Sequence, residues 1–235
     1  MKFKLPSVRH FAVALPFAIL LFATSALAGP PLICHTLDIG NAKSLPWVSH
    51  DWNLTGSEPY DAKNLPADTI AILDADPTVL VHMETLRRAT LYGQRDLNAA
   101  KQLLLKLIAR SDAAGKNTLA AALASFDLGY FAETLSQAQW LYKNSGNPAQ
   151  GFDGYALVKK AIQLRGNDPQ MEFAAALITL NGLSDGHQGH AQRAIAGAKS
   201  DPLLARNLST HFHGPETETM AYLISRTSSV KVAQQ

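Results

Sequence analysis

The sequence predicts an all-α protein, an irregular array of roughly seven to nine helices that begins with a non-regular N-terminal arm. Apolar residues recur at the spacing of one helix face in three successive blocks, Asn117–Lys143, Asp153–Arg165 and Asp168–Leu180. Each block has one apolar stripe and must pack against a neighbour to bury it. The dipeptide Asp-Pro, which starts helices, occurs at positions 76, 168 and 201. No stretch alternates apolar and polar residues between turn signals, so we expect no sheet.

Residues 1–28 form a predicted leader that does not belong to the fold. The first ten residues are basic, residues 11–24 are apolar, and Ala26–Ala28 supplies a cut site with small residues. This pattern is typical of a secretory signal peptide, and an uncleaved membrane anchor is the alternative. We therefore expect an exported protein, periplasmic or extracellular, with no membrane span after cleavage.

The leader accounts for the positive charge of the chain. The whole sequence has 21 basic and 19 acidic residues, a net charge of +2. Loss of the leader removes Lys2, Lys4 and Arg9 and no acidic residue, which leaves 18 basic against 19 acidic residues and a net charge of −1. No Lys/Arg stripe remains for nucleic acid or anionic lipid, so we expect neither as a partner.

Residues 29–64 have a different composition from the rest and predict an irregular arm. They hold four prolines, several Gly, Ser and Asn residues, and no sustained helical period. They also hold two of the three tryptophans, Trp47 and Trp52. Since a disordered tail would be poorer in aromatic residues, we expect an arm that lies on the helical body, pinned by its Trp side chains. A mobile segment is the alternative.

The helical domain is predicted over residues 65–226, with a frayed tail at residues 227–235. Its helix boundaries come from Asp residues at N-caps, from Gly residues at helix ends and from the apolar period. Within the block that ends at Lys143, Gly129 permits either a close helix contact or a bend. The other predicted helices are Leu65–Leu73, Asp76–Tyr92, Asp96–Arg110, His187–Ala198, Asp201–Phe212 and Thr217–Arg226.

Part of the chain resembles tetratricopeptide repeats. Within the helix pair Tyr155–Leu180, Ala161–Leu164 followed by Asp168-Pro169 is similar to the second helix of a repeat and the start of the next. Phe126–Phe131 resembles the Leu-Gly-x-x-Tyr part of a first helix. A clean period of about 34 residues is missing. The resemblance therefore implies an irregular, TPR-like α-α superhelix that binds other chains through a concave face, and it implies no catalysis.

The best candidate for a ligand site is a histidine group in the C-terminal third. His187 and His190 are three residues apart and would share a helix face, and His211 and His213 stand at a predicted helix end. Imidazoles on one face suit zinc or copper, so these four residues are a candidate metal site. The alternative is that they are surface or interhelical histidines, hydrogen-bonded to the backbone or to carboxylates.

Cys34 and His35 are a second candidate site. Because Cys34 is the only cysteine, neither an intrachain disulfide nor a two-cysteine haem attachment motif is available. Adjacent side chains diverge in an extended chain, which disfavours a Cys–His catalytic dyad. We expect the thiol to be buried between arm and body, and pairing with another chain or a reactive thiol is the alternative. This segment, Gly29–His35 with Ser44–Trp47, resembles the mature start of exported bacterial proteins with no assigned activity.

Two polar groups have structural interpretations. Glu84, Arg87 and Arg88 are expected to form a solvated ion-pair network on the surface of a helix. His50–Asp51 is compatible either with a turn or with part of a small-ligand pocket.

Aromatic residues surround the predicted loop at residues 144–151. We expect an aromatic core there, with a ligand-binding cleft as the alternative. The residues are Phe131, Trp140, Tyr142, Phe152 and Tyr155.

The sequence contains no phosphate loop, dinucleotide glycine signature, nucleophile elbow or zinc-peptidase helix, although many active sites lack a linear motif. We therefore favour an exported scaffold that binds a protein or peptide partner through a helical groove, with no cofactor. The alternative function is a metal-binding protein or metal-dependent hydrolase that uses the C-terminal histidines.

Overall fold

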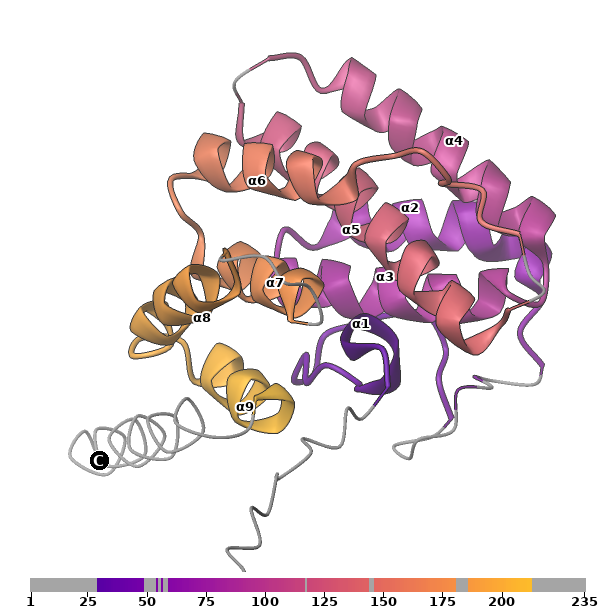
Figure 1. Cartoon of the computed structure of the whole chain (residues 1–235). Coiled ribbons are helices and arrows are strands. Elements are labelled where there is room, and N and C mark those ends of the chain that lie inside the picture. Colours follow the sequence, from indigo (N-terminus) through magenta and orange to yellow (C-terminus); the bar gives the residue numbers. More distant parts are fainter. Residues whose placement is uncertain are drawn as a thin grey trace, which may run out of the picture.

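The computed structural model describes residues 29–48, 54, 56, 59–116, 118–143, 146–180 and 186–212. These residues contain nine α-helices and no strand, which confirms the all-α prediction (Figure 1). The predicted leader, the helix Thr217–Arg226 and the frayed tail lie outside the described residues, as do His50–Asp51 and Trp52.

A short helix and a 3₁₀ turn precede the helical body. The helix α1 (Pro31–Cys34) lies in the arm, and the turn Ala62–Asn64 leads into α2. None of the helices in the described part of the chain is both long enough and apolar enough to cross a membrane. The body consists of α2 (Leu65–Ala75), α3 (Val79–Gly93), α4 (Leu97–Ala113), α5 (Leu119–Leu141), α6 (Gly154–Arg165), α7 (Pro169–Thr179), α8 (Gly186–Gly197) and α9 (Pro202–His211).

The helix α5 is the centre of the body. It is the longest helix and contacts α3, α4 and α6, and α7 packs mainly on α8. In Figure 1, α8 and α9 lie at the lower left, α4 at the upper right, and α1 beside α3. The aromatic side chains Phe126, Tyr130 and Phe131 of α5 are fully buried in the main hydrophobic core.

Aspartate side chains begin four of the helices. Asp96, Asp153, Asp168 and Asp201 accept hydrogen bonds from backbone N–H groups in the first turns of α4, α6, α7 and α9. Such a cap stabilises a helix by about 1 kcal/mol relative to alanine, because first-turn N–H groups otherwise lack partners. Gly166 ends α6 in the left-handed conformation, with φ 74°. The predicted start positions of these four helices are confirmed.

The helix start predicted at Asp76–Pro77 is wrong by two residues. The helix α3 begins at Val79, and its N-cap is Thr78. Asp76 instead ends α2 with an extended backbone (φ −131°, ψ 118°), the conformation that a following proline favours. The carbonyl oxygen of Asp76 lies 2.6 Å from Nε2 of His82. The turn is therefore held by a side chain of α3 that the dipeptide pattern cannot reveal.

Gly129 allows the backbones of α5 and α6 to meet. The helix α5 is continuous through this residue, and the predicted close helix contact is confirmed. A Cβ atom at Gly129 would lie 2.6 Å from the carbonyl oxygen of Gly154 and 2.8 Å from Cβ of Leu157. A Cβ atom at Gly154 would lie 2.5 Å from the carbonyl oxygen of Gly129. Only glycine at both positions permits this approach.

Gly129→Ala should lower the free energy of unfolding by about 1–3 kcal/mol, although alanine alone favours a helix by about 1 kcal/mol. The added Cβ meets backbone atoms of α6, which cannot move aside as a flexible side chain can. Urea unfolding measures the change. The control is Gly189→Ala in α8, where the nearest atom is the end of the Arg193 side chain at 3.4 Å. Equal destabilisation by both substitutions would contradict this account.

Residues 29–48 lie along the helical body. Trp47 packs edge-on against Tyr92 of α3, with ring centroids 5.8 Å apart, and the guanidinium of Arg87 stands 5.1 Å from the Trp47 ring. Trp47 therefore pins the arm in the expected manner. The buried aliphatic anchors of the arm are Leu32, Ile33, Leu37 and Leu45.

A buried ion network on α3 holds the arm in place. Glu84 is 0% and Arg87 1% exposed, so the prediction of a solvated network is wrong. The Glu84 carboxylate accepts hydrogen bonds from Arg87 Nε at 2.8 Å, Arg88 Nε at 2.7 Å and the arm N–H of Leu37 at 3.0 Å. The two arginines also donate to backbone carbonyl oxygens of the arm. The spacing along α3 allows an exposed network, but the arm covers it.

Candidate functional site

The C-terminal histidines lie at helix junctions. Nδ1 of His187 in α8 lies 2.9 Å from a carbonyl oxygen of α7, and the ring packs edge-on against Phe212. Nδ1 of His211 in α9 donates to a carbonyl oxygen of its own helix at 2.7 Å. His213 lies outside the described residues. Among the residues that the structure describes, no three His, Cys, Asp or Glu side chains are grouped so as to hold a metal ion. The zinc or copper site stays a prediction.

His190 connects three helices through its two ring nitrogens. Nδ1 lies 2.5 Å from Oε2 of Glu172 in α7, and Nε2 lies 2.7 Å from the hydroxyl of Tyr155 in α6. The other carboxylate oxygen of Glu172 accepts from Nε of Arg193 at 2.6 Å. Glu172 is 1% exposed, Tyr155 is half-buried and the side chain of Arg193 is 49% exposed. These contacts lead from a buried carboxylate to a phenol near the surface.

The hydrogen positions in this group follow from the partners. Since Glu172 is paired with Arg193, its carboxylate accepts, and we assign the imidazole hydrogen to Nδ1 of His190. Nε2 is then the acceptor for the hydroxyl of Tyr155. Nη2 of Arg193 lies 2.9 Å from Nδ1 and places a positive charge beside the ring. A guanidinium nitrogen only donates, so with a hydrogen on Nδ1 this contact is one of charge and not a hydrogen bond. A hydroxyl, a base and a carboxylate that orients the base are the parts of a nucleophilic site.

Sequence reasoning missed the partners of His190. It placed Tyr155 in an expected aromatic core and assigned no role to Glu172 or Arg193. One signal was available: Glu172 is the single polar residue in the run Met171–Leu177. When the neighbours of a carboxylate along a helix are all apolar, that segment tends to be buried, and the carboxylate then needs a buried partner.

A second buried histidine lies between α3 and α5. Nδ1 of His82 is 2.6 Å from Oδ1 of Asp127, and Nε2 is 2.6 Å from the carbonyl oxygen of Asp76. A carbonyl only accepts, so Nε2 carries a hydrogen, and a hydrogen on Nδ1 as well makes the ring a cation. Burial lowers the pKa of His82, but the charge and hydrogen bond of Asp127 outweigh it, and the net pKa is raised. Both ring nitrogens are engaged, and both side chains are fully buried, so this pair is structural.

His211 is the opposite case, a buried neutral histidine. Burial lowers the pKa of its ring to about 4. Nε2 is buried and has no hydrogen-bond partner within the described residues. The ring of His35, from the arm, stands edge-on to His211 with centroids 5.4 Å apart. Protonation of His211 would therefore place an unpaired charge at the contact between the arm and α9.

We expect acid to destabilise the protein through His211 by about 3 kcal/mol, since each pKa unit corresponds to about 1.4 kcal/mol. The folded pKa of about 4 lies below the unfolded value of 6.5. The unfolded state therefore binds the proton first, and the stability present above pH 6.5 is lost as the pH falls through 4. His211→Gln should flatten this part of the unfolding free energy against pH, with no change in slope above about pH 7. An unchanged acid slope in the variant would contradict the prediction.

Cys34 and His35 contact different neighbours. Cys34 ends α1 and is half-buried, and burial raises the pKa of its thiol. Little thiolate therefore forms near neutral pH, which disfavours a reactive thiol. His35 stands against His211 instead. Pairing of Cys34 with another chain stays a prediction.

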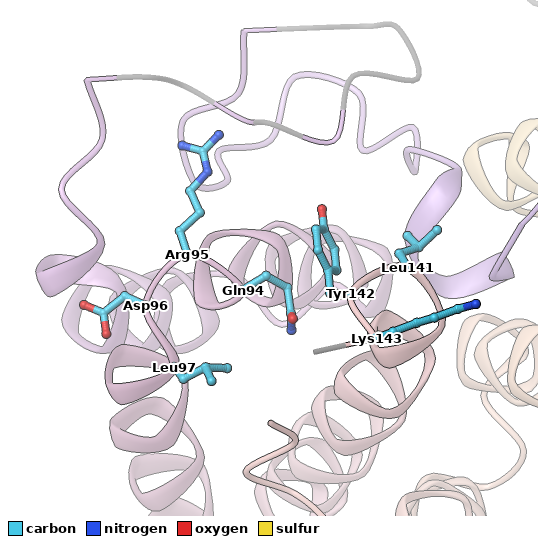
Figure 2. Close-up of a pocket in the computed structure, with 7 residues that line it drawn as sticks. All are labelled: Gln94, Arg95, Asp96, Leu97, Leu141, Tyr142 and Lys143. Atoms are coloured by element: carbon cyan, nitrogen blue, oxygen red, sulfur yellow. The ribbon is translucent and has the colours of Figure 1, made fainter. Parts of the chain in front are cut away.

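An open cleft of about 780 Å³ lies where the turn between α3 and α4 meets the end of α5. Figure 2 shows Leu97 on one side, Leu141 and Tyr142 on the other, and Gln94 between them. The remaining lining residues are Arg95, Asp96 and Lys143.

The predicted aromatic core near the loop at residues 144–151 is wrong for two of its members. Trp140 is 69% and Phe152 41% exposed, whereas Phe131 is fully buried. Tyr142 and Tyr155 are half-buried. Helix periodicity places Trp140 in the last turn of α5, but the neighbouring helices leave that side chain exposed. Tyr142 lines the cleft, which agrees with the alternative interpretation for this residue alone.

The fold and these sites define an all-α protein whose buried histidines and carboxylates join neighbouring helices. No protein-family model matches the sequence, and no curated protein and no solved structure matches the chain. The tetratricopeptide resemblance stays a prediction, and the function has to be inferred from the sites.

Proposed function

We propose that this protein is an exported scaffold that binds a protein or peptide partner, a role that implies no catalysis. The supporting observation is the cleft beside the end of α5, with its exposed apolar side chains. Leu97 and Leu141 line it and are 37% and 40% exposed. Trp140, the neighbour of Leu141 in sequence, is the most exposed tryptophan of the described residues. Exposed aromatic and aliphatic groups around a cleft are typical of interaction sites.

The charges of the cleft define the chemistry of the partner. Lys143 contributes a positive charge. Asp96, the one acid among the described residues that line the cleft, is engaged in the N-cap of α4, where it accepts from the N–H groups of Asn98 and Ala99. We therefore expect an occupant with an apolar side chain for the two leucines and a nearby carboxylate for Lys143.

Selection of a displayed random peptide library on the purified protein tests this function. Enriched peptides should combine an apolar residue with Asp or Glu. Leu141→Asp should weaken a selected peptide at least ~10-fold, because it places a charge where the apolar side chain binds. Lys143→Glu should weaken binding of the same peptide, because it removes the cation that faces the carboxylate of the peptide.

Leu119→Asp is the matched control, because Leu119 is 67% exposed but lies at the other end of α5. It should leave the peptide affinity unchanged. Enrichment of basic peptides, or equal effects of the two aspartate variants, would refute docking at this cleft.

Export is part of the same proposal, and it predicts a defined mature start. Residues 1–28 act as the signal peptide in this proposal. It is supported by Leu32 and Ile33, which are buried only a few residues after the proposed cut. Intact-mass measurement of protein recovered outside the cytoplasm should give a chain that begins at Gly29. A chain that retains its leader would favour the membrane-anchor alternative.

A further inference from the structure

We infer that Tyr155, His190 and Glu172 form a nucleophile, base and orienting carboxylate that hydrolyse phosphodiesters. The hydroxyl of Tyr155 is 2.7 Å from Nε2 of His190, and Nδ1 of His190 is 2.5 Å from Oε2 of Glu172. Both distances lie within hydrogen-bond reach, and the base is fixed by a third group, as an activated nucleophile requires. This activity goes beyond partner binding and uses a different part of the molecule.

Glu172, His190 and Tyr155 differ in solvent exposure in the way that a catalytic site requires. Glu172 is almost fully buried and held by Arg193, so the carboxylate stays fixed. Tyr155 is only half-buried, so its side chain is less enclosed than those of Glu172 and His190. Gly186 makes room for it, because a Cβ at this position would lie 2.9 Å from the Tyr155 hydroxyl oxygen. The position of the phenol is therefore set by its contacts with Gly186 and His190 of α8.

Two cations beside the phenol indicate an anionic substrate. Nζ of Lys159 lies 4.5 Å from the centroid of the Tyr155 ring. The guanidinium of Arg193 contacts Glu172 and His190. With Glu172 the group carries a net charge of about +1, which matches the single charge of a phosphodiester. Arginine and lysine stabilise the charge that develops on the phosphoryl oxygens in the transition state.

The reaction balances with the residues present. The Tyr155 oxygen forms a bond to phosphorus while its proton passes to Nε2 of His190. The bond from phosphorus to the leaving oxygen breaks, and His190 gives that proton to the leaving alcohol. Water then attacks the phosphorus of the tyrosyl phosphodiester, which still carries the other alcohol. His190 takes the proton of the water and returns it to the tyrosine oxygen as that bond breaks. The net change is phosphodiester and water to phosphomonoester and alcohol.

Burial explains why the phenol needs this base. It raises the pKa of Tyr155, and the nearby charge of Arg193 only partly offsets the effect. The phenol therefore keeps its proton near neutral pH, and attack requires a base within hydrogen-bond distance.

Hydrolysis of bis(p-nitrophenyl) phosphate by the purified protein tests the inference. The protein should release p-nitrophenolate, and Tyr155→Phe should lower the rate by at least ~100-fold. His190→Gln should lower it by about 10²–10⁴-fold. Mass spectrometry of acid-quenched protein should place a p-nitrophenyl phosphoryl group on Tyr155. The rate should persist in a chelator, whereas loss there would overturn the triad in favour of metal-dependent hydrolysis.

Tyr60→Phe is the matched control, because it also removes a tyrosine hydroxyl that is hydrogen-bonded to a side chain, that of Asp68. It should leave the rate unchanged. Tyr155→Phe removes only one oxygen, and thermal unfolding checks that the variant is folded. No release above the rate of Tyr155→Phe, or a label on another residue, would leave the three side chains with a purely structural role.

Discussion

Glu84→Gln is expected to lower the free energy of unfolding by about 3–5 kcal/mol, the usual cost of removing one partner from a buried ion pair. Glutamine leaves Arg87 buried without its counter-charge and weakens the acceptor for Arg88 and for the arm N–H of Leu37. Burial raises the pKa of Glu84, but the charges of the two arginines outweigh it and hold the pKa below its ordinary value. Urea unfolding measures the loss.

The same variant should release the arm before the helices unfold. Limited proteolysis should cut within residues 29–48 faster than in the unsubstituted protein, because the arm is held mainly by this network and its aliphatic anchors. Arg206→Gln is the control. It also removes an ion pair between arm and body, with Asp38, but both side chains are about half exposed. Such a pair contributes about 0–1 kcal/mol. Similar losses in the two variants would refute the importance of burial.

Asp127→Asn should have a comparable effect of about 3–5 kcal/mol, because it removes the charge that two cations share. Asp127 is fully buried, accepts from Nδ1 of His82 at 2.6 Å and is also paired with Arg110 of α4. Asparagine would leave the His82 ring either charged without a counter-ion or neutral with an unpaired nitrogen. Either state weakens the contact of α3, α4 and α5.

The pH dependence distinguishes this pair from His211. The folded pKa of His82 is raised above the unfolded value of 6.5. Its contribution is therefore fully present below pH 6.5 and is lost as the pH rises through the folded pKa. The difference between Asp127→Asn and the unsubstituted protein should be larger at about pH 6 than in alkali.

Asp74→Asn is the matched control for the same arginine. Asp74 accepts from Nε of Arg110 at 2.9 Å, but its side chain is 59% exposed. We expect a loss of about 0–1 kcal/mol and little dependence on pH near neutrality. A larger effect at Asp74 than at Asp127 would contradict the proposed arrangement.

Much of the fold could be predicted because its signals are local. The caps at Asp96, Asp153, Asp168 and Asp201 act within a single helical turn, so the sequence places these helix starts within one residue. Asp76 shows where prediction from local signals fails. The same Asp-Pro dipeptide ends α2 there, because the carbonyl of Asp76 binds His82 and the chain stays extended as far as Thr78.

The candidate site was only partly predictable. The spacing of His187 and His190 indicates a shared helix face, yet the residues that define the chemistry of His190 come from two other helices. Glu172 lies 18 positions away and Tyr155 lies 35 positions away. Without a linear motif, nothing in the sequence connects them.

The sequence by itself determined the helical class and the starts of most helices, since each depends on neighbours within a few residues. It also marked Gly129 as a point of close contact or of bending, and the structure decided between the two. Only the tertiary structure decided the environment of the charges. Glu84 and Arg87 have the spacing of an exposed pair, and the covering arm makes them buried. Trp140 is an aromatic residue that a sequence pattern assigns to the core, but its position at the end of α5 leaves it exposed. The free energy of a charge or an aromatic ring depends on the water that remains around it, and distant segments of the chain determine that water.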